Sequence, residues 1–236
     1  MLARTLEPEV MEDRDEAIEY NDMDFREVNA AFVRDLIEFA ERTQPKGLGF
    51  DVLDLGTGTA LIPVVLCQSV PGVRVMASDA SVEMLELARY NIEVHRMLDR
   101  IQLHRADAKK LVFQKGYFDG VMSNSLVHHL PTHDLFFAEA LRVLRPGGLL
   151  FVRDLFRPET SDEVETLVQL HASGETERSQ QLLRQSLHAA LTVPEVQSIV
   201  NPLGIPEAAI TMTSDRHWTL AYRKPGEMAE SHLDSI

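Results

Sequence analysis

The chain is poor in cysteine, in long apolar runs and in basic residues. Its 236 residues include one cysteine, Cys67, so no disulfide can form within the chain, which is typical of a reducing compartment. Cys67 lies in a helical pattern and is interpreted as a small core residue. The longest apolar runs, such as 60–67, are far shorter than the ~20 residues that span a bilayer. The N-terminus has no apolar signal-peptide region. We therefore expect a cytoplasmic protein without a membrane segment.

Basic residues are outnumbered by acidic ones, 23 against 37, which gives a formal net charge of −14. Residues 1–45 alone hold 13 acidic and 5 basic side chains. A surface of this sign repels phosphate backbones and disfavours a nucleic-acid partner, although acidity also serves simply to keep a protein soluble. The hydrophobic content of 44% is ordinary for a globular chain, and the length suits one large domain with or without a lid.

The stretch 52–60 organises the chain around it; it reads Val-Leu-Asp-Leu-Gly-Thr-Gly-Thr-Ala. An apolar run meets Asp54 and then Gly56 and Gly58, and a helical pattern begins at Leu61. This predicts a buried strand, a tight turn and a helix whose N-terminus faces a ligand. The dinucleotide fingerprint requires a small residue where Leu61 stands, so a pyrophosphate cradle is disfavoured. A P-loop is excluded because no Gly-Lys-Ser/Thr follows.

The rest of the chain alternates strand and helix patterns. Acidic residues end two of the strands: Asp79 follows the second, 23 residues after Gly56, and Asp107 follows the third. Ser81 and Thr132 are predicted to cap helices, and the Thr160/Glu163 and Thr192/Glu195 pairs have capping-box spacing. Strands are expected at 73–78, 100–105, 117–123, 149–152, 208–213 and 218–222. Helices are expected from about 24, from 81 and from 132, and across residues 160–203 with a break at 173–174.

These motifs, in this order, resemble those of the class I S-adenosylmethionine-dependent methyltransferases. Residues 52–60 resemble motif I, residues 123–126 stand in the place of motif IV, and the Pro-Gly-Gly turn at 146–148 precedes the fifth strand. The resemblance covers roughly residues 50–155. It implies a Rossmann-like, doubly wound, mostly parallel seven-stranded sheet with a C-terminal antiparallel hairpin and an N-terminal helical lid. It departs from the family at Ala60, where a third glycine is common and alanine is tolerated.

The resemblance also implies S-adenosylmethionine as cofactor and S-adenosylhomocysteine as product. Asp79 is expected to hold the ribose, because an acidic residue at the end of the second strand does so in nucleotide-binding folds. Its alternative role is a helix cap, which Ser81 already offers. Asp107 is expected at the adenine amino group, with a loop or capping carboxylate as the alternative. The full set of expected cofactor residues is Asp54, Gly56, Thr57, Gly58, Asp79, Ala80, Met84, Asp107, Ala108 and Ser123.

Two adjacent histidines follow the fourth strand. His128 and His129 are the candidates for a general base, because imidazole titrates near neutral pH. A cofactor-packing or structural role is the alternative, and at most one of the two is expected to face the pocket. A metal site with His133 is not expected, because three convergent ligands are needed and Pro131 interrupts the stretch. The absence of Asn/Asp-Pro-Pro-Tyr at 123–126 argues against methylation of nucleobase or glutamine nitrogens.

Six further residues are candidates for contact with the methyl acceptor: Tyr20, Asn124, Arg153, Asp154, Arg157 and His217. Arg153 and Asp154 leave a buried strand and need partners or a substrate; a mutual salt bridge is the alternative. His217 adjoins Trp218, which is expected to pack in the sheet. We expect a helical cap at 1–45, a methyltransferase domain at 46–225 whose substrate-shaping segment is 160–203, and a loose tail at 226–236.

The sequence therefore predicts methyl transfer to a small-molecule acceptor by a monomer or homodimer. The methylated atom, oxygen, carbon or nitrogen, stays open. Two other classes remain as alternatives. One is an RNA or protein methyltransferase, and the other is a protein that binds S-adenosylmethionine without methylating.

Overall fold

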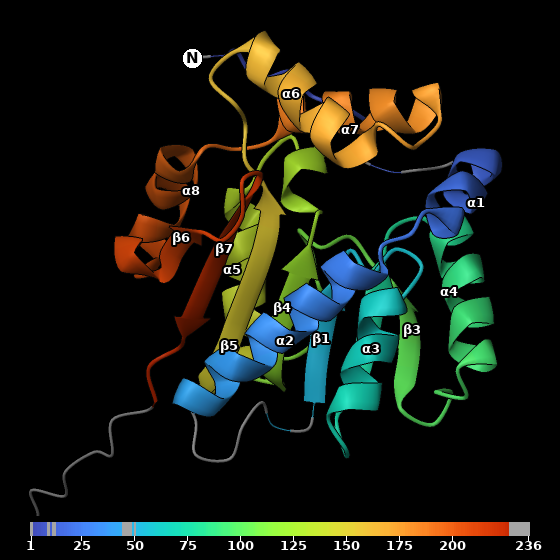
Figure 1. Cartoon of the computed structure of the whole chain (residues 1–236). Helices are drawn as coiled ribbons and strands as arrows, with labels where there is room; N and C mark the ends of the chain where they lie inside the picture. Colours follow the sequence, from blue (N-terminus) through green and yellow to red (C-terminus); the bar gives the residue numbers. More distant parts are fainter. Residues whose placement is uncertain (1, 9, 11–12, 44–48, 50, 227–236) are drawn as a thin grey trace, which may run out of the picture.

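The computed structural model describes residues 2–8, 10, 13–43, 49 and 51–226. Its centre is a sheet with strand order β3-β2-β1-β4-β5-β7-β6. Strands β1 to β5 pair in parallel, and β7 pairs antiparallel with both β5 and β6. The predicted sheet and its C-terminal hairpin are confirmed (Figure 1). The strands are β1 (Asp51–Leu55), β2 (Arg74–Asp79), β3 (Ile101–Arg105), β4 (Phe118–Asn124), β5 (Leu144–Leu155), β6 (Ile210–Met212) and β7 (His217–Arg223).

Helices cover both faces of the sheet. On one face α2 (Arg26–Thr43), α3 (Leu61–Ser69) and α4 (Val82–Val94) pack on β1, β2 and β4 through an apolar cluster that includes Phe32, Leu66 and Ile92. On the other face α5 (Asp134–Val143) and α8 (Val193–Val200) pack on a second cluster. Trp218 is fully buried in that second cluster, as predicted from its place in the hairpin. The crossover changes face between β1 and β4, which makes this a doubly wound sheet.

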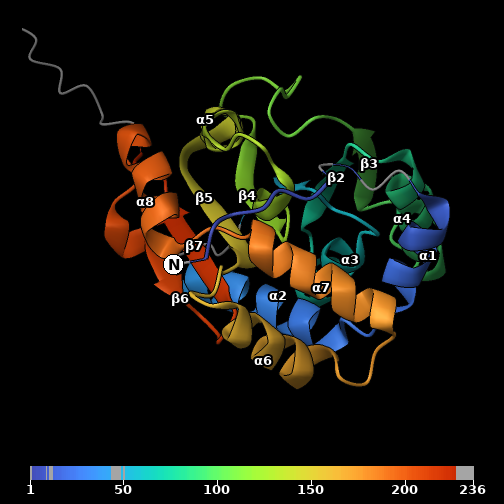
Figure 2. The same cartoon turned by 90° about the horizontal axis from the view of Figure 1, so that it is seen from above.

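Three helices lie over the carboxyl ends of the parallel strands rather than against a face. Helix α1 (Arg14–Asp22) contacts α4, while α6 (Ser161–Ala172) and α7 (Glu177–Ala189) pack on each other above the sheet (Figure 1). Seen from above, residues 2–8 run alongside α7 in the direction of α1 (Figure 2). We name residues 2–8 the N-terminal strap. Its Thr5 amide donates to the carbonyl of His188 in α7 at 3.0 Å. No helix in the described part of the chain has the length and apolarity to cross a membrane.

Most predicted helix boundaries agree with the structure. Both capping boxes form, at Thr160 and at Thr192. Ser81 caps α4, and α6 ends at Ala172, next to the predicted break. The prediction that Thr132 caps the next helix was wrong: α5 has His133 at its N-cap position without a side-chain hydrogen bond. Nearly all of the expected 226–236 tail lies outside the described residues.

Strand β5 is longer than the sequence indicated, because it begins at Leu144 and runs through the Pro-Gly-Gly turn. Its register against β4 shifts between Phe118 and Gly120, which accommodates the turn as an irregularity within the strand. Gly148 permits this close approach, since a Cβ there would lie 2.8 Å from the carbonyl oxygen of Asp119. A glycine-rich sequence signals a bend but not whether pairing continues through it.

Candidate cofactor and acceptor site

A pocket opens at the carboxyl edge of the sheet, where β1 and β4 lie side by side and the crossover changes face. This is the position where open α/β sheets bind ligands. The loops that follow β1, β2, β3 and β4 form its walls, and the cap helices close it from one side. Its lining includes Tyr20, Asp54, Gly56, Thr57, Gly58, Asp79, Ala80, Met84, Asp107, Ala108, Asn124, Leu126 and His129.

The glycine loop after β1 is folded tightly against the ends of β2 and β4. The amides of Gly56 and Thr57 both donate to the carbonyl of Ser78 at 2.9 Å. Gly56 has a φ of +71°, and a Cβ there would meet Leu126 at 2.8–2.9 Å. Ala60 holds a left-handed φ of 59° at the N-cap of α3 and offers no side-chain cap. The helix therefore presents its first amides toward the pocket, where Leu61 and Ile62 line the wall.

Asp79 braces the glycine loop and borders the pocket at the same time. Its Oδ2 accepts a hydrogen bond from the Gly58 amide at 2.8 Å, and its Oδ1 accepts one from the Ser81 amide at 2.9 Å. The Ser81 hydroxyl in turn accepts from the Met84 amide at 3.1 Å. Asp79 thus orders the start of α4 while Ser81 caps it. Because each carboxylate oxygen has further lone pairs, these contacts leave capacity for ribose hydroxyls.

Carboxyl groups dominate the electrostatics of the pocket. Burial raises the pKa of Asp54 to about 7, and the nearby Asp79 carboxylate adds to that rise. The pKa of Asp79 is also raised by burial. Tyr20 lines the same wall, and burial together with the Asp79 charge raises its pKa to about 12. Ionising both Asp54 and Asp79 in the empty pocket is costly, because both are buried and both carry negative charge. A positively charged ligand would reduce this cost, so the pocket favours such a ligand.

Asp107 lines the pocket from the loop after β3. Its Oδ1 accepts a hydrogen bond from the Lys109 amide at 2.8 Å, and the Lys109 ammonium lies 3.0 Å away. Burial acts to raise the pKa of Asp107, but the Lys109 contacts outweigh it and lower the pKa. Ala108 lines the pocket beside it. Ser123 is placed differently from the prediction. It is fully buried, and its hydroxyl donates to the Leu55 carbonyl at 2.8 Å, tying β4 to β1 below the pocket.

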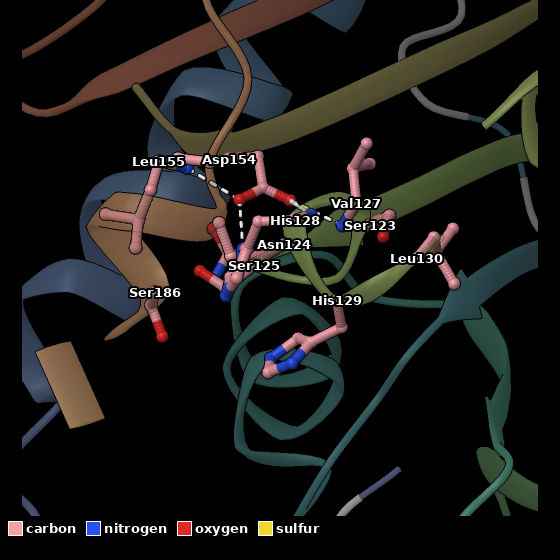
Figure 3. A network of polar contacts seen from close by, with 12 residues as sticks. Ser123, Asn124, Ser125, Val127, His128, His129, Leu130, Asp154, Leu155 and Ser186 are labelled. Carbon is pink, nitrogen blue, oxygen red and sulfur yellow. Dashed lines mark hydrogen bonds and ion pairs between the residues drawn. The ribbon is translucent and has the colours of Figure 1, made fainter. Parts of the chain in front are cut away.

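The two histidines lie on a short helix, η1 (Val127–His129), and their environments differ. His129 lines the pocket, whereas His128 is buried behind it, which agrees with the prediction that at most one faces the pocket. Nδ1 of His128 lies 2.5 Å from Oδ1 of Asp154, and Oδ2 of Asp154 accepts the Val127 amide at 2.5 Å. Figure 3 shows Asp154 reaching η1 from the end of β5. Asp154 is therefore a partner of His128 and not a pocket-wall residue.

A residue that the sequence did not suggest completes this cluster. Oε1 of Glu7, in the N-terminal strap, lies 3.2 Å from Nε2 of His128 and 3.1 Å from Nδ1 of His129. Burial acts to lower the pKa of His128, but Asp154 and Glu7 raise it to about 10. Burial and the adjacent His128 charge lower the pKa of His129 to about 4. His128 is therefore an imidazolium at neutral pH and His129 a neutral imidazole.

Glu7, His128 and His129 also offer donor types suited to a transition metal. The two imidazole rings lie 4.2 Å apart between centroids with an interplanar angle of 33°. A metal binds in the plane of each imidazole, along the nitrogen lone pair. Rings stacked in this way direct their lone pairs side by side rather than toward one point. The arrangement suits an ion-pair cluster better than a metal centre.

Three of the six residues expected to contact the acceptor do not line the pocket. Each of them contacts another residue of the protein instead. Arg153 donates to Thr219 at 2.9 Å and to Asp35 at 2.7 Å, so the predicted alternative of a mutual pair with Asp154 was also wrong. Arg157 pairs with Glu195 at 2.5 Å. His217 meets the Ser214 hydroxyl at 2.8 Å, and burial lowers its pKa to about 4. A buried strand end places charged side chains against neighbouring elements as readily as against a ligand.

Asp154, the fourth of the six, pairs with His128 as described, and the last two, Tyr20 and Asn124, line the pocket. The Asn124 amide donates from Nδ2 to Ser125 at 3.1 Å, and its Oδ1 is buried with no hydrogen-bond partner within the described chain. A buried acceptor that borders a pocket is a natural contact for a ligand N–H or O–H group. The cap contributes more than the sequence indicated, because Phe25 and Asn29 of the α1–α2 region also line the pocket. Their spacing had indicated only a helix with an apolar face.

The sheet is doubly wound and ends in an antiparallel hairpin, and a glycine-rich, carboxylate-lined pocket lies at its switch point. These features are typical of Rossmann-like cofactor-binding proteins. Residues 53–152 match the family model described as "Methyltransferase domain". This part of the chain, which carries the glycine loop, is therefore similar to a methyltransferase domain. The fold is shared with an S-adenosylmethionine-dependent methyltransferase from Aquifex aeolicus, with a TM-score of 0.62 at 17% identity over 90% of this chain and 99% of that one.

Individual relatives match part of the chain. Methyltransferase GfsG of Streptomyces halstedii is 33% identical over 120 residues, which are 51% of this chain and 43% of GfsG. A ubiquinone biosynthesis O-methyltransferase of Chelativorans sp. is 30% identical over 141 residues, 56% of this chain and 53% of that protein. The chain thus spans about half the length of these curated relatives. The structure of the plantazolicin methyltransferase BpumL in complex with SAH has the same fold, with a TM-score of 0.70 at 14% identity, over 90% of this chain and 91% of that one.

Proposed function

We propose that this protein transfers a methyl group from S-adenosylmethionine to a small-molecule acceptor. The observation that carries the proposal is the pocket at the switch point, where Gly56, Gly58, Asp79 and Asp107 converge from three successive loops. Two relatives are named as methyltransferases, GfsG and a ubiquinone biosynthesis O-methyltransferase, which supports a methyl-transfer role. The name of the second also supports a small-molecule acceptor. The net charge of −14 makes an RNA acceptor unfavourable.

The residues around the pocket suit the parts of this cofactor. The glycine loop allows close approach of the methionine portion, and the open N-terminus of α3 suits its carboxylate. Asp79 would accept hydrogen bonds from the ribose hydroxyls and Asp107 one from the adenine amino group. Asp54, with its pKa raised to about 7 by burial, would be ionised more fully beside the positive charges of the cofactor. Met84 and Ala108 would pack on the adenosine.

When bound, S-adenosylmethionine supplies a methyl group on a sulfonium, which is already reactive toward nucleophiles. The protein's task is therefore to hold the acceptor in line with the methyl carbon and the sulfur. Positioning of this kind supplies about 7–11 kcal/mol in favourable cases. Tyr20, Asn124 and His129 border the space beside the cofactor loops and would orient the acceptor there. Asp154 holds His128 in a fixed orientation behind His129. The neutral imidazole of His129 is then the candidate for accepting any proton of the acceptor.

The same contacts support the expected division of the chain. Residues 1–45 would act as a cap, since Tyr20, Phe25 and Asn29 line one side of the pocket. Residues 46–225 would be the methyltransferase domain. Within them, 160–203 would shape the acceptor space, because α7 contacts η1. The single cysteine and the acidic composition support a cytoplasmic location.

Isothermal titration of the purified protein with S-adenosylmethionine, S-adenosylhomocysteine and NAD tests this proposal. We expect micromolar binding of the first two and none of NAD. Binding of NAD alone would overturn the cofactor assignment. Binding of the two adenosyl compounds without methyl transfer to any acceptor in small-molecule extracts would instead identify a non-methylating S-adenosylmethionine-binding protein. A control titration with adenosine alone measures the part of the binding free energy that comes from Asp79 and Asp107. The difference from S-adenosylhomocysteine then gives the contribution of the glycine loop.

A further inference from the structure

The N-terminal strap is held in place by its own hydrogen bonds. The Arg4 guanidinium donates to the carbonyl of Ala189 at 2.6 Å, and to the carbonyls of His128 and Leu130 at 3.0 and 3.1 Å. These bonds join the strap to the end of α7 and to η1. Three residues further along, Glu7 is thereby brought against the two histidines. The position of this carboxylate is set by the strap as a whole and not by an isolated surface contact.

The Glu7 carboxylate is almost completely buried, with its side chain 7% exposed. Its Oε1 has no directed hydrogen bond within the described chain, although it lies against the two imidazoles. Its Oε2 accepts a hydrogen bond from the Ser186 hydroxyl at 3.3 Å. His129 belongs both to this cluster and to the pocket wall. The Glu7 carboxylate therefore lies directly against a residue of the pocket wall.

The charges around His128 make it a receptor for anions. Asp154 from β5 holds Nδ1, and Glu7 from the strap lies at Nε2. His129 on the same short helix is neutral, and Arg4 of the strap binds the backbone carbonyl of His128. Asp154 is the strongest influence that keeps the His128 ring protonated. Because Asp154 occupies Nδ1, the Nε2 proton remains available to a second carboxylate, and a buried imidazolium without one would carry a large desolvation cost.

We propose that the methyl acceptor is an ionised carboxylic acid, and that its carboxylate replaces Glu7 at Nε2 of His128. Glu7 is then the protein's own occupant of the acceptor position, and the strap is displaced when the acceptor binds. This inference rests on the proposed methyl transfer. It names a carboxylate as the acceptor class and assigns His128 the role of an anion-binding residue, in place of a general base.

The chemistry balances without a base. One carboxylate oxygen forms a bond to the methyl carbon as the carbon–sulfur bond breaks, and the electron pair of that bond stays on the sulfur of S-adenosylhomocysteine. No proton is released. The anion and the sulfonium become a neutral methyl ester and a neutral thioether, a loss of charge that a buried site favours. The neutral ester no longer pairs with His128, so Glu7 can return and help release the product.

A binding experiment on the full chain tests this directly. Propionate has the same carboxylate and methylenes as the glutamate side chain, and propionamide is its uncharged counterpart. In the Glu7→Ala variant with S-adenosylhomocysteine bound, we expect propionate to bind saturably and to shift the imidazole nitrogen signals of His128 in NMR spectra of histidine-labelled protein. We expect its affinity to exceed that for the parent protein about tenfold or more, since the site is vacated.

Three matched variants make the result specific. Glu7→Gln keeps the position filled with a neutral side chain and should bind propionate no better than the parent protein. Glu86→Ala removes an exposed glutamate of α4 and should behave like the parent protein. His128→Gln in the Glu7→Ala background should abolish the response. If propionate leaves His128 unchanged in Glu7→Ala, or if propionamide binds equally well, the inference is wrong.

The pH dependence of turnover separates this inference from the proposed function. An anion-binding imidazolium predicts that kcat/KM falls as pH rises through the pKa of His128, whereas a general base predicts that it falls as pH decreases. A fall toward low pH with a neutral alcohol acceptor would overturn the anion role and leave methyl transfer intact. Failure to bind S-adenosylmethionine, with propionate still bound by Glu7→Ala, would refute the proposed function instead.

Discussion

The backbone amide of Gly58 donates a hydrogen bond of 2.8 Å to Oδ2 of Asp79, which joins the loop after β1 to the end of β2. The other oxygen of the same carboxylate accepts the Ser81 amide and so fixes the start of α4. One side chain therefore sets the relative position of two of the pocket's walls. Any change at Asp79 acts on the ligand contact and on the shape of the pocket together.

Asp79→Asn should lower the affinity for S-adenosylhomocysteine about 10- to 100-fold, because hydrogen bonds to a charged acceptor contribute about 1.5–3 kcal/mol. The amide group must also turn an N–H toward either Gly58 or Ser81, which loosens the loop. Calorimetry with S-adenosylhomocysteine is the suitable measurement. Because this product lacks the sulfonium charge, a lost attraction between that charge and Asp79 would not contribute to the change in affinity. Glu86→Gln serves as the control. Unchanged affinity in Asp79→Asn would refute the ribose assignment.

Gly56→Ala and Gly58→Ala test whether the loop needs glycine for conformation or for space. Both positions have a left-handed φ, +71° and +53°, which costs a non-glycine residue about 1–2 kcal/mol. Only at Gly56 would the new Cβ meet another side chain, that of Leu126 at 2.8 Å. We expect Gly58→Ala to lose about 1 kcal/mol of unfolding free energy and Gly56→Ala clearly more. Urea denaturation measures both, and equal losses would contradict a steric role for Leu126.

The glycine loop and the acidic residues that end β2 and follow β3 could be predicted because each depends on local sequence, whereas the seven-stranded sheet was implied by the resemblance to a family. The apolar run before Gly56 gives the strand, and the spacing to Asp79 places its partner at the same edge of a parallel sheet. Both capping boxes were likewise predictable, since their residues lie three apart. Contacts of this kind need only a few neighbouring residues to be in register.

The contacts around η1 could not be predicted, because they join residues far apart in the sequence. Glu7 lies 121 positions before His128, and nothing in the acidic N-terminal segment distinguishes it from its acidic neighbours. Arg153 pairs with Asp35, 118 positions away. A charged residue at the end of a buried strand requires a partner, but the sequence does not show whether that partner is a ligand or another helix. The tertiary packing of the cap decides it.

The affinity for S-adenosylmethionine should rise with pH through the range around 7, whereas that for S-adenosylhomocysteine should change less. Burial raises the pKa of Asp54 to about 7, so this carboxyl is partly protonated at neutral pH. The sulfonium compound carries one more positive charge than the product, and it gains attraction as Asp54 ionises. Calorimetry of both ligands from pH 6 to 8.5 measures the difference. Asp54→Asn should remove the pH dependence, and parallel profiles for the two ligands would contradict it.

The two capping boxes offer a matched pair for stability, because only one of them also neutralises a buried charge. Glu195 accepts the Thr192 amide at 2.8 Å through Oε2 and pairs through Oε1 with Arg157, whose side chain is 3% exposed. Glu163 makes the same cap at the start of α6 on the surface. Glu195→Ala should cost about 2–4 kcal/mol, since it leaves a buried guanidinium without its carboxylate.

Glu163→Ala should cost only about 1 kcal/mol, the usual value for a lost cap. Urea unfolding of the two variants at pH 7 measures the difference. Burial acts to raise the pKa of Glu195, but its hydrogen bonds to Thr192 and Arg157 lower it on balance. A lowered carboxyl pKa stabilises the fold above the pKa of the unfolded chain, and this stabilisation is lost as pH falls through the folded value. The excess cost of Glu195→Ala should therefore shrink in acid. Equal costs for both variants at pH 7 would mean that water solvates Arg157 when its partner is removed.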